Sequence, residues 1–519
     1  MTEPKPKSIR NLEPLGLDKV PVLDVSGFRR TIVDAVRNGA RVSSFFGVPA
    51  SALAEGNAAT PAPDGAASPV RLFAVLASVE TGTLSVLSAL VQGEYPSLTP
   101  ECPQVHWFER EIWEQWSVKP AGHPWLKPIR FHAPYAPTGS GAAAGAEIGV
   151  AEFFRIEGAE VHEVAVGPVH AGVIEPGHFR FQCHGENVYH LEISLGYQHR
   201  GVEPALVGGP NRRTLHYLET LAGDTSVGHA TAYARLVEAL AGAAAPPRAM
   251  SLRGIALELE RLANHTGDLG ALAGDVAYLP TASYCGRLRG DFLNLSALLC
   301  GNRFGRGLIV PGGVNFDADR ELIAELQARL AAAAADVQGA VELLWQTPSV
   351  MARFENTGAL SLELATELGL VGPVARACGA RMDVRHDFPA GIYQFVQVPM
   401  STWNTGDVFA RAYVRWLEIQ KSIAFIQERA EALPDGACRQ DLPVAPDRRQ
   451  FAVSLVEGWR GEICHVAITN SAGRFIRYKI VDPSFHNWIG LAMALRGQPI
   501  SDFPLCNKSF NLSYCGHDL

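Results

Sequence analysis

The sequence predicts an α+β protein in which a small N-terminal α+β domain precedes a large, mainly helical domain with small edge sheets. Three observations indicate this fold class. Apolar runs of strand length fill the first 133 residues, apolar residues at helical spacing dominate from about residue 211, and a stretch rich in Pro, Gly, Ala and Ser lies between them. We therefore expect a tail over residues 1–20, a first domain over 21–133, a linker over 134–159 and a second domain over 160–519.

The first domain is expected to open with a helix over Phe28–Asn38, because Gly39 follows as a typical helix stop. A β-hairpin is predicted where Glu80-Thr81-Gly82 joins two apolar runs. The composition of Ser51–Ser68, rich in Ala, Pro and Gly, is typical of a surface insertion. The other expected elements are strands at Arg41–Val48, Val70–Val79 and Thr83–Val91 and a short aromatic helix at His106–Trp116.

The second domain is expected to begin with strands and to continue as helices. One buried helix face is indicated by apolar residues at 3-4-3 spacing, namely Leu252, Ile255, Leu259 and Leu262. Strands are expected at Val161–Val166 and His178–Gln182, long helices at Glu321–Trp345 and Asp407–Leu433, and a β-rich segment at Phe451–Val481. An irregular stretch is expected to close the chain.

Composition and charge exclude several classes of protein. The 519 residues suffice for two or three domains, and a net charge of −8 provides no basic field for nucleic acid, so we expect no nucleic-acid partner. The polar, Pro-rich N-terminus lacks the apolar core of a signal peptide. No stretch reaches the roughly 18 apolar residues that cross a bilayer. We expect a cytoplasmic protein that reaches the membrane only through partners.

The nine cysteines are scattered, and no two have C-x-x-C spacing. An odd, scattered set does not fit a disulfide framework, nor a metal or iron–sulfur site built by this chain alone. We expect isolated buried thiols. A glycine-rich G-x-G-x-x-G loop is also missing, so we expect this chain not to bind a dinucleotide directly.

Three segments carry a family resemblance. They are YPSLT, WFEREIWEQW and GHP (within Tyr95–Pro124); GPVHAGVIEPGHFRF and LGYQHRGVEP (within Gly167–Pro204); and RYKIVDPSFHNW and SDFPLCNKSFNLSYCGHDL (within Arg477–Leu519). The first is similar to the C-type subunit of NADH-quinone oxidoreductase. The second resembles the large subunits of energy-converting nickel–iron hydrogenases and, less closely, the D-type subunit of NADH-quinone oxidoreductase. The third occupies the place of the family's C-terminal metal-binding motif.

The resemblance covers roughly residues 25–133 and 160–519. The chain is identified as similar to the formate-hydrogenlyase-type and hydrogenase-4-type large subunits, which are equivalent to a fusion of the C-type and D-type subunits of NADH-quinone oxidoreductase. This implies a hydrogenase-large-subunit-like fold for the second domain. It also implies a small iron–sulfur subunit, a ferredoxin-like iron–sulfur subunit and antiporter-like membrane subunits as partners. The iron–sulfur clusters are then in the partners, and the assembly lies on the inner face of the cell membrane.

The nickel–iron centre of this family needs four cysteine thiolates, because soft sulfur donors hold and bridge both metals. The resemblance places the four ligand positions, with His229 in register, at Ala222, Thr225, Ser513 and Gly516. None of these side chains supplies a thiolate, and Cys515 is one residue out of register. We therefore expect no metal in this chain.

Quinone is the alternative ligand that the resemblance suggests. In the D-type subunits of the family a histidine and a tyrosine contact the quinone head-group, and the matching positions here are Ile174 and Gly223. Both contacts are then missing, although a one-residue gap in the match would bring His178 or Tyr233 closer to the site. No cofactor bound by this chain is predicted, and quinone stays a candidate.

Ionisable residues remain around the place of the lost metal. Glu203 matches the glutamate that relays protons from the hydrogenase metal site. We expect the ionisable groups to lie around one cavity, as a proton relay or as a hydrogen-bonded polar plug. The relay candidates are Glu203, His229, Asp224 and His170, and His517 and Asp518 are expected beside them.

Two functions fit the sequence. In the first, the chain is an oxidoreductase subunit of a complex I-like or hydrogenase-4-like complex without a nickel–iron centre. It takes part in NADH- or formate-linked electron transfer, with quinone as candidate acceptor, coupled to proton or ion translocation. In the second, it is a catalytically silent scaffold or coupling subunit of the same complex. Hydrogenase activity is not expected.

Overall fold

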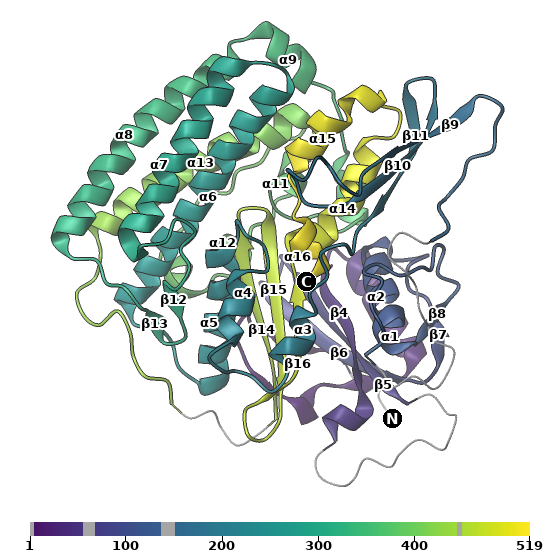
Figure 1. The fold of residues 1–519 in the computed structure, drawn as a ribbon. Coiled ribbons are helices and arrows are strands. Elements are labelled where there is room, and N and C mark those ends of the chain that lie inside the picture. The colour runs from purple at the N-terminus through teal and green to yellow at the C-terminus, as the bar shows by residue number, and fades with distance from the viewer. Residues whose placement is uncertain (1–4, 55–67, 136–150, 444–448) are drawn as a thin grey trace.

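The computed structural model describes residues 5–54, 68–135, 151–443 and 449–519. These residues form an N-terminal sheet with two helices, a small second sheet, a bundle of long helices, and a C-terminal sheet followed by three helices (Figure 1). The predicted α+β fold class is confirmed. Most of the expected surface insertion, and the central part of the expected linker, lie outside the described residues. The predicted domain boundaries stay predictions.

Runs of buried apolar residues build a five-stranded N-terminal sheet with the order β1-β6-β5-β4, and β3 pairs with β6. The predicted hairpin is confirmed, because β5 and β6 pair antiparallel from Val70 and Val91 to the turn. Helix α1 begins where the Asp24 carboxylate accepts a hydrogen bond from the Gly27 amide at 2.6 Å. The elements are β1 (Lys7–Ile9), β3 (Val22–Leu23), α1 (Val25–Arg37), β4 (Arg41–Pro49), β5 (Val70–Ser78) and β6 (Thr83–Val91).

Helix α2 (His106–Trp116) has the predicted bounds and packs against β4. Two short parallel strands, β7 (Glu94–Pro96) and β8 (Lys119–Ala121), flank it. The second sheet has the order β11-β10-β9, and a loop over residues 167–177 joins β9 to β10. Its strands are β9 (Val161–Val166), β10 (His178–His184) and β11 (Asn187–Ser194).

Four long helices, α6, α7, α8 and α13, lie side by side at the upper left of Figure 1. The predicted apolar face of α6 is confirmed, since the four residues predicted for it are buried, namely Leu252, Ile255, Leu259 and Leu262. Helix α5 packs between α6 and the C-terminal sheet. The bounds are α5 (Ser226–Ala241), α6 (Pro247–Asp275), α7 (Leu279–Cys300), α8 (Arg320–Trp345) and α13 (Val408–Glu431). Shorter elements are α3 (Val202–Leu206), α4 (Thr214–Glu219), β12 (Ile309–Val310), β13 (Gly313–Val314), α9 (Pro348–Phe354), α10 (Leu362–Glu367), α11 (Gly372–Ala377) and α12 (Val384–Asp387).

The C-terminal sheet contains a strand from the N-terminus. Its order is β16-β15-β14-β2, and β2 (Leu15–Gly16) pairs antiparallel with β14. The expected tail over residues 1–20 is therefore corrected: β1 and β2 both belong to sheets, and Leu15 and Leu17 are buried. Strands of two or three residues are too short to show a periodic pattern in the sequence. The remaining strands are β14 (Gln450–Gly458), β15 (Gly461–Thr469) and β16 (Phe475–Val481).

The end of the chain is helical, which corrects the expected irregular stretch. The Asp482 carboxylate accepts a hydrogen bond from the Ser484 amide at 2.8 Å, and Pro483 occupies the first helical turn, a favourable helix start. The last residue, Leu519, is buried, and Figure 1 places the C-terminus in the middle of the molecule. The helices are α14 (Pro483–Ala494), α15 (Phe503–Phe510) and α16 (Tyr514–Asp518).

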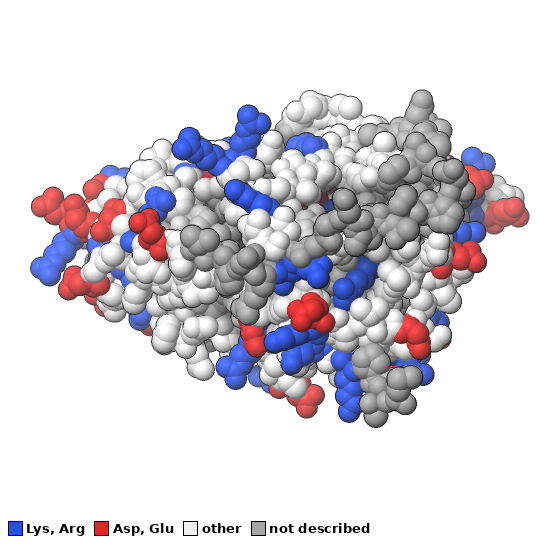
Figure 2. All heavy atoms as spheres, turned by 90° about the horizontal axis from the view of Figure 1, so that it is seen from below, with Lys and Arg blue, Asp and Glu red and all other residues white. Residues whose placement is uncertain are grey.

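The surface carries both signs of charge. On the face seen in Figure 2, basic and acidic side chains lie close to one another and are separated by uncharged areas. None of the helices in the described ranges is long and apolar enough to cross a lipid bilayer. The nine cysteines are free thiols, as expected, and seven of them are buried.

Candidate functional site

Four buried side chains form a continuous hydrogen-bonded chain between α5 and the C-terminal sheet. His229 Nδ1 lies 3.0 Å from His465 Nε2 on β15, and His229 Nε2 lies 3.1 Å from an Asp482 carboxylate oxygen. At the other end, His465 Nδ1 lies 2.9 Å from the Tyr478 hydroxyl on β16. All four side chains are shielded from solvent.

The carboxylate end sets the direction of this chain. Burial alone would raise the pKa of Asp482, but the hydrogen bond from His229 and the charge of Arg460 lower it, so Asp482 accepts hydrogen bonds as a carboxylate. Burial holds the pKa of His465 well below its usual value, so its ring is neutral and has one N–H. The Tyr478 hydroxyl therefore donates to His465, His465 donates to His229, and His229 donates to Asp482.

Arg460, whose charge acts on Asp482, forms a bidentate ion pair with a second carboxylate, that of Asp224. The two terminal nitrogens of Arg460 donate to the Asp224 carboxylate oxygens at 2.6 and 2.8 Å. The Arg460 guanidinium also lies 3.9 Å from the ring centre of Trp459. Burial would raise the pKa of Asp224, but the charge of Arg460 lowers it. Arg460 therefore stabilises the charges of both Asp224 and Asp482.

The positions that the resemblance assigns to the four ligand cysteines border this group. The Ser513 hydroxyl accepts a hydrogen bond from the Gly516 amide at 2.9 Å, which caps α16. A Cβ atom at Gly516 would lie 2.7 Å from the Asp482 carboxyl carbon, so this carboxyl group occupies the space of a side chain at that position. The Thr225 hydroxyl accepts a hydrogen bond from the Trp459 indole at 3.2 Å, and Ala222 is fully buried.

Glu203 belongs to a different group of charges. Its carboxylate accepts hydrogen bonds from Arg477 at 2.8 Å and from the Ile480 amide at 3.0 Å, and it lies 3.1 Å from the Lys479 ammonium. Lys479 also donates to both carboxylate oxygens of Glu111 on α2 at 2.7 Å. Burial would raise the pKa of Glu203, but Lys479 and Arg477 lower it. Glu203 thus connects β16 to α2 as an ionised ion-pair partner.

His170 lies apart from the other predicted residues. Its Nε2 donates to the Gly177 carbonyl at 2.9 Å within its own loop. Glu175 attaches this loop to α16, because its carboxylate faces the amides of Tyr514 and Cys515 at 3.3 and 3.4 Å. The apolar side chains of the loop are exposed, namely Val169, Val173 and Ile174.

The C-terminal pair His517 and Asp518 forms a third buried group. His517 Nδ1 lies 3.0 Å from the Asp518 carboxylate, which also accepts hydrogen bonds from the Gly196 and Gln198 amides. The backbone carbonyl of His517 accepts hydrogen bonds from Arg130 at 2.8 and 3.0 Å. Arg130 also forms an ion pair with Glu111, so this group adjoins that of Glu203.

The structure thus brings together two predicted residues, His229 and Asp224, and separates Glu203 and His170 from them. The hydrogen-bonded chain, together with Arg460 and Asp224, is the central group of the protein. Four residues that complete it were not predicted: Asp482, His465, Tyr478 and Arg460. Asp482 has a local signal, the Asp-Pro sequence of a helix start. His465 and Arg460 lie in and beside an apolar β-rich run, and nothing local in the sequence distinguishes them from packing residues.

Comparisons with known proteins place this geometry in a family. Residues 275–452 match the model of the respiratory-chain NADH dehydrogenase 49 Kd subunit, and residues 55–138 match that of the 30 Kd subunit. The chain is 32% identical to the carbon monoxide-induced hydrogenase of Rhodospirillum rubrum over 351 residues, which cover 67% of this chain and 97% of that protein. It belongs to the family of complex I-like and hydrogenase large subunits.

Two further relatives come from the two branches of this family. Formate hydrogenlyase subunit 5 of Escherichia coli is 29% identical over 84% of this chain and 80% of its own length. NADH-quinone oxidoreductase subunit 4 of Thermus thermophilus is 29% identical over 66% of this chain and 90% of its own length. The two family matches in one chain support a fused subunit of the C-plus-D type.

The side chains at the family's ligand positions do not fit a nickel–iron centre. Ala, Thr, Ser and Gly provide no thiolate. Burial and the nearby Glu175 raise the pKa of the Cys515 thiol to about 12, so it stays protonated. Within the described ranges, no group of three His, Cys, Asp or Glu side chains is arranged to hold a metal ion.

Proposed function

We propose that this chain is the large subunit of a membrane-associated complex I-like or hydrogenase-4-like complex, and that it works without a nickel–iron centre. The complex carries out redox-linked electron transfer, from NADH or formate, coupled to proton or ion translocation. Iron–sulfur clusters of partner subunits carry the electrons, and quinone is the candidate acceptor. Membership in the complex I-like family supports the role as a subunit.

One observation carries the proposal that no metal is used. Where the sequence match places the fourth cysteine, at Gly516, the Asp482 carboxyl group fills the space. This carboxylate is held by His229, and Arg460 pairs with Asp224 beside it. Each charge has a partner of opposite sign or a hydrogen-bond donor, as a stable buried polar group requires. The central group is therefore a polar plug in the place of the metal.

The filled site favours the second of the two roles, a coupling or scaffold subunit, over direct electron transfer through this chain. A quinone head-group or metal needs room beside Ser513 and Gly516, and both residues are buried against other side chains. The directional chain from Tyr478 to Asp482 provides groups that exchange protons. We infer that partner subunits carry the electrons and that this chain responds by a proton shift.

The proposed partners are a small iron–sulfur subunit, a ferredoxin-like iron–sulfur subunit and antiporter-like membrane subunits, on the inner face of the cell membrane. The loop over residues 167–177 supports a contact with the small subunit. Its side chains Val173 and Ile174 are 85% and 54% exposed, although its base is fixed to α16 through Glu175. A rigid loop with an apolar tip is suited to burial against another protein.

Purification of the native complex through a tag on this chain tests the proposal. Nickel content is measured, together with quinone reduction driven by NADH, formate or reduced ferredoxin and the accompanying ion translocation. We expect no stoichiometric nickel. Because the plug is a coupling element, His229→Ala should reduce ion translocation per electron more than the rate of quinone reduction. The exposed Glu325→Gln on α8 is the control, and it should leave both unchanged.

The outcomes separate the two roles. Stoichiometric nickel in the native complex would overturn the proposal. If His229→Ala abolishes quinone reduction while the complex stays assembled, the chain takes part in electron transfer directly, and the coupling role is wrong. Glu203→Gln, in the neighbouring charge group, provides a second variant for the same comparison.

A further inference from the structure

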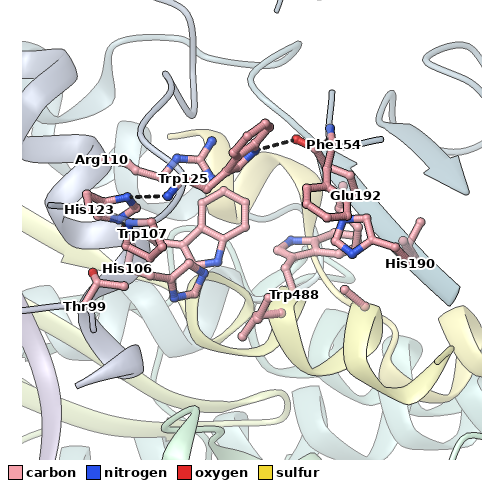
Figure 3. Close-up of a pocket in the computed structure, with 15 residues that line it drawn as sticks. Thr99, His106, Trp107, Arg110, His123, Trp125, Phe154, His190, Glu192 and Trp488 are labelled. Atoms are coloured by element: carbon pink, nitrogen blue, oxygen red, sulfur yellow. Dashed lines mark hydrogen bonds between the residues drawn. The ribbon is translucent and has the colours of Figure 1, made fainter. Parts of the chain in front are cut away.

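A pocket of about 300 Å³ lies between the N-terminal part of the fold and the C-terminal helices. One wall comes from α2, with Trp107 and Arg110, and from the segment after β8, with Trp125. The facing wall comes from β11 and the segment before β9, with His190, Glu192 and Phe154 (Figure 3). Helix α14 closes the pocket. None of these residues belongs to the groups around His229 and Glu203.

The walls are aromatic, with one ring pair edge to face and another tilted. Trp125 meets Phe154 at a ring-centre distance of 6.0 Å and an interplanar angle of 81°, and Phe154 meets His190 at 4.7 Å. Rings in these orientations present both faces and edges to the space between them, which favours a flat aromatic guest. The volume is at the lower end of the range for small-molecule sites, so the guest is small.

The pocket also contains one cation without a carboxylate hydrogen-bond partner. Arg110 donates from Nε and one terminal nitrogen to the Lys127 and Pro128 carbonyls, at 2.7 and 2.8 Å, and its guanidinium lies 4.9 Å from the Trp107 ring centre. Across the described ranges, no carboxylate hydrogen-bonds to it. Burial lowers the pKa of Arg110 to about 10, so it stays charged at neutral pH.

The one carboxylate in the wall is already used by other donors. Glu192 pairs with Lys127, and it accepts hydrogen bonds from the Trp125 indole at 3.1 Å and from the Phe154 amide at 2.8 Å. The indole N–H of Trp107 is buried, and it has no hydrogen-bond partner within the part of the chain that the structure describes. The charges of Glu192 and Glu114 act on Arg110 without a direct hydrogen bond. The pocket therefore combines apolar walls with a guanidinium that has no carboxylate hydrogen-bonded to it and, within the described residues, an indole N–H group without a partner.

We propose that this pocket binds a small aromatic carboxylate, with the ring between Trp125, Trp107 and Phe154 and the carboxylate oriented toward Arg110. A carboxylate balances the buried guanidinium by a charge-assisted hydrogen bond. A neutral aromatic molecule leaves the guanidinium without a direct carboxylate partner, and a cation is repelled by it. One arginine and this volume also fit a monoanion better than a nucleotide, whose several charges need more cations.

The test uses the full-length purified chain and two probes of equal shape, 2-naphthoate and the neutral 2-naphthamide. Binding is measured by calorimetry and by quenching of tryptophan fluorescence, since Trp107 and Trp125 line the pocket. We expect 2-naphthoate to bind roughly tenfold or more tightly than 2-naphthamide, the difference expected of one charge-assisted hydrogen bond. Ala492→Phe, which fills the pocket from α14, should abolish binding.

Two further variants separate the site from a general effect. Phe154→Ala removes one wall from a partly exposed position and should weaken binding of 2-naphthoate, whereas Phe395→Ala, at a 75% exposed position outside the pocket, should not. Equal affinity for the two probes would overturn the proposal. So would undiminished binding by a folded Ala492→Phe variant, or no binding of 2-naphthoate by the unmodified chain.

Discussion

The Nδ1 atom of His229 lies 3.0 Å from the Nε2 atom of His465, although 236 residues separate them in the sequence. When the other nitrogen of His229 donates its one N–H to the Asp482 carboxylate, His465 is the donor in this bond. This arrangement of protons satisfies every member of the hydrogen-bonded chain, and its donors all point toward Asp482.

Removing the first donor of this chain should destabilise the protein. In Tyr478→Phe, the Nδ1 atom of His465 loses its donor and stays buried without a hydrogen bond. We expect the free energy of unfolding to fall by about 1–3 kcal/mol, the cost of one unsatisfied buried polar group. Denaturant unfolding measures the difference. Tyr284→Phe, at an exposed position of α7, is the matched control, and an equal loss there would contradict the explanation.

Removing the charge at the other end should cost more. Asp482→Asn keeps a group that caps α14 but leaves the Arg460 guanidinium with less negative charge around it. A loss of about 3 kcal/mol in the free energy of unfolding is expected, because the hydrogen bonds from His229 and the Ser484 amide no longer go to a charged group. Asp291→Asn, in an exposed ion pair with Arg287 on α7, should change stability by less than about 1 kcal/mol. Similar losses in both variants would show that Asp482 has no special electrostatic role.

The space at Gly516 provides a steric prediction. A methyl group there would lie 2.7 Å from the Asp482 carboxyl carbon, so Gly516→Ala should destabilise the protein by about 1–3 kcal/mol. Gly286 on α7 has no atom within 4 Å of an added Cβ, and there the same change should stabilise the helix by about 0.5–1 kcal/mol. Thermal unfolding of the two variants gives the comparison. Opposite signs are expected, and a stable Gly516→Ala protein would mean that the plug rearranges easily.

A buried carboxyl group of α6, which contacts the first turn of α5, predicts a pH dependence of stability. Glu260 accepts hydrogen bonds from the Val227 and Gly228 amides, and burial raises its pKa to about 8, from an ordinary value of 4.5. The folded chain therefore holds a proton that the unfolded chain releases above its own pKa. The contribution of Glu260 to stability is present below about pH 4.5 and is lost as the pH rises toward about 8.

Glu260→Gln should remove this contribution to the slope. Between about pH 5 and 8, unfolding free energies of the unmodified protein should fall relative to those of the variant, by on the order of 1.4 kcal/mol per pH unit at most. Exposed Glu325→Gln should keep the original slope. Parallel pH profiles for Glu260→Gln and the unmodified protein would contradict the raised pKa.

Local patterns in the sequence predicted the helices and strands that are determined by residues close together in the sequence. Helix α2 was predicted with its bounds, and the β5–β6 hairpin was predicted from its turn. The pairing of β2 with β14 was not predicted, because a two-residue strand has no periodicity and its partner lies more than 400 residues away. The start of α14 shows a missed local signal, since Asp482-Pro483 is a favourable helix start within a run that resembles a strand.

The candidate site was predicted only in part, because some of its residues lie in short sequence motifs and others come together only in the folded chain. The family resemblance located His229, Asp224 and the four substituted positions, because they lie in short motifs. Asp482, His465 and Arg460 come from the β14–α14 region and meet the first motif only in the folded chain. Glu203 was predicted as a proton relay, and the ion pairs that surround it are visible only in three dimensions. The relay role itself stays a prediction.

The pairing of β2 with β14 has a consequence for the order of synthesis. The edge of the C-terminal sheet is formed by residues that leave the ribosome long before β14, so the sheet cannot be completed until β14 has been made. A chain cut in the segment between residues 135 and 151 would leave two pieces that still share this sheet. We expect such pieces to reassociate by strand addition, as two polypeptides that behave as one folded protein.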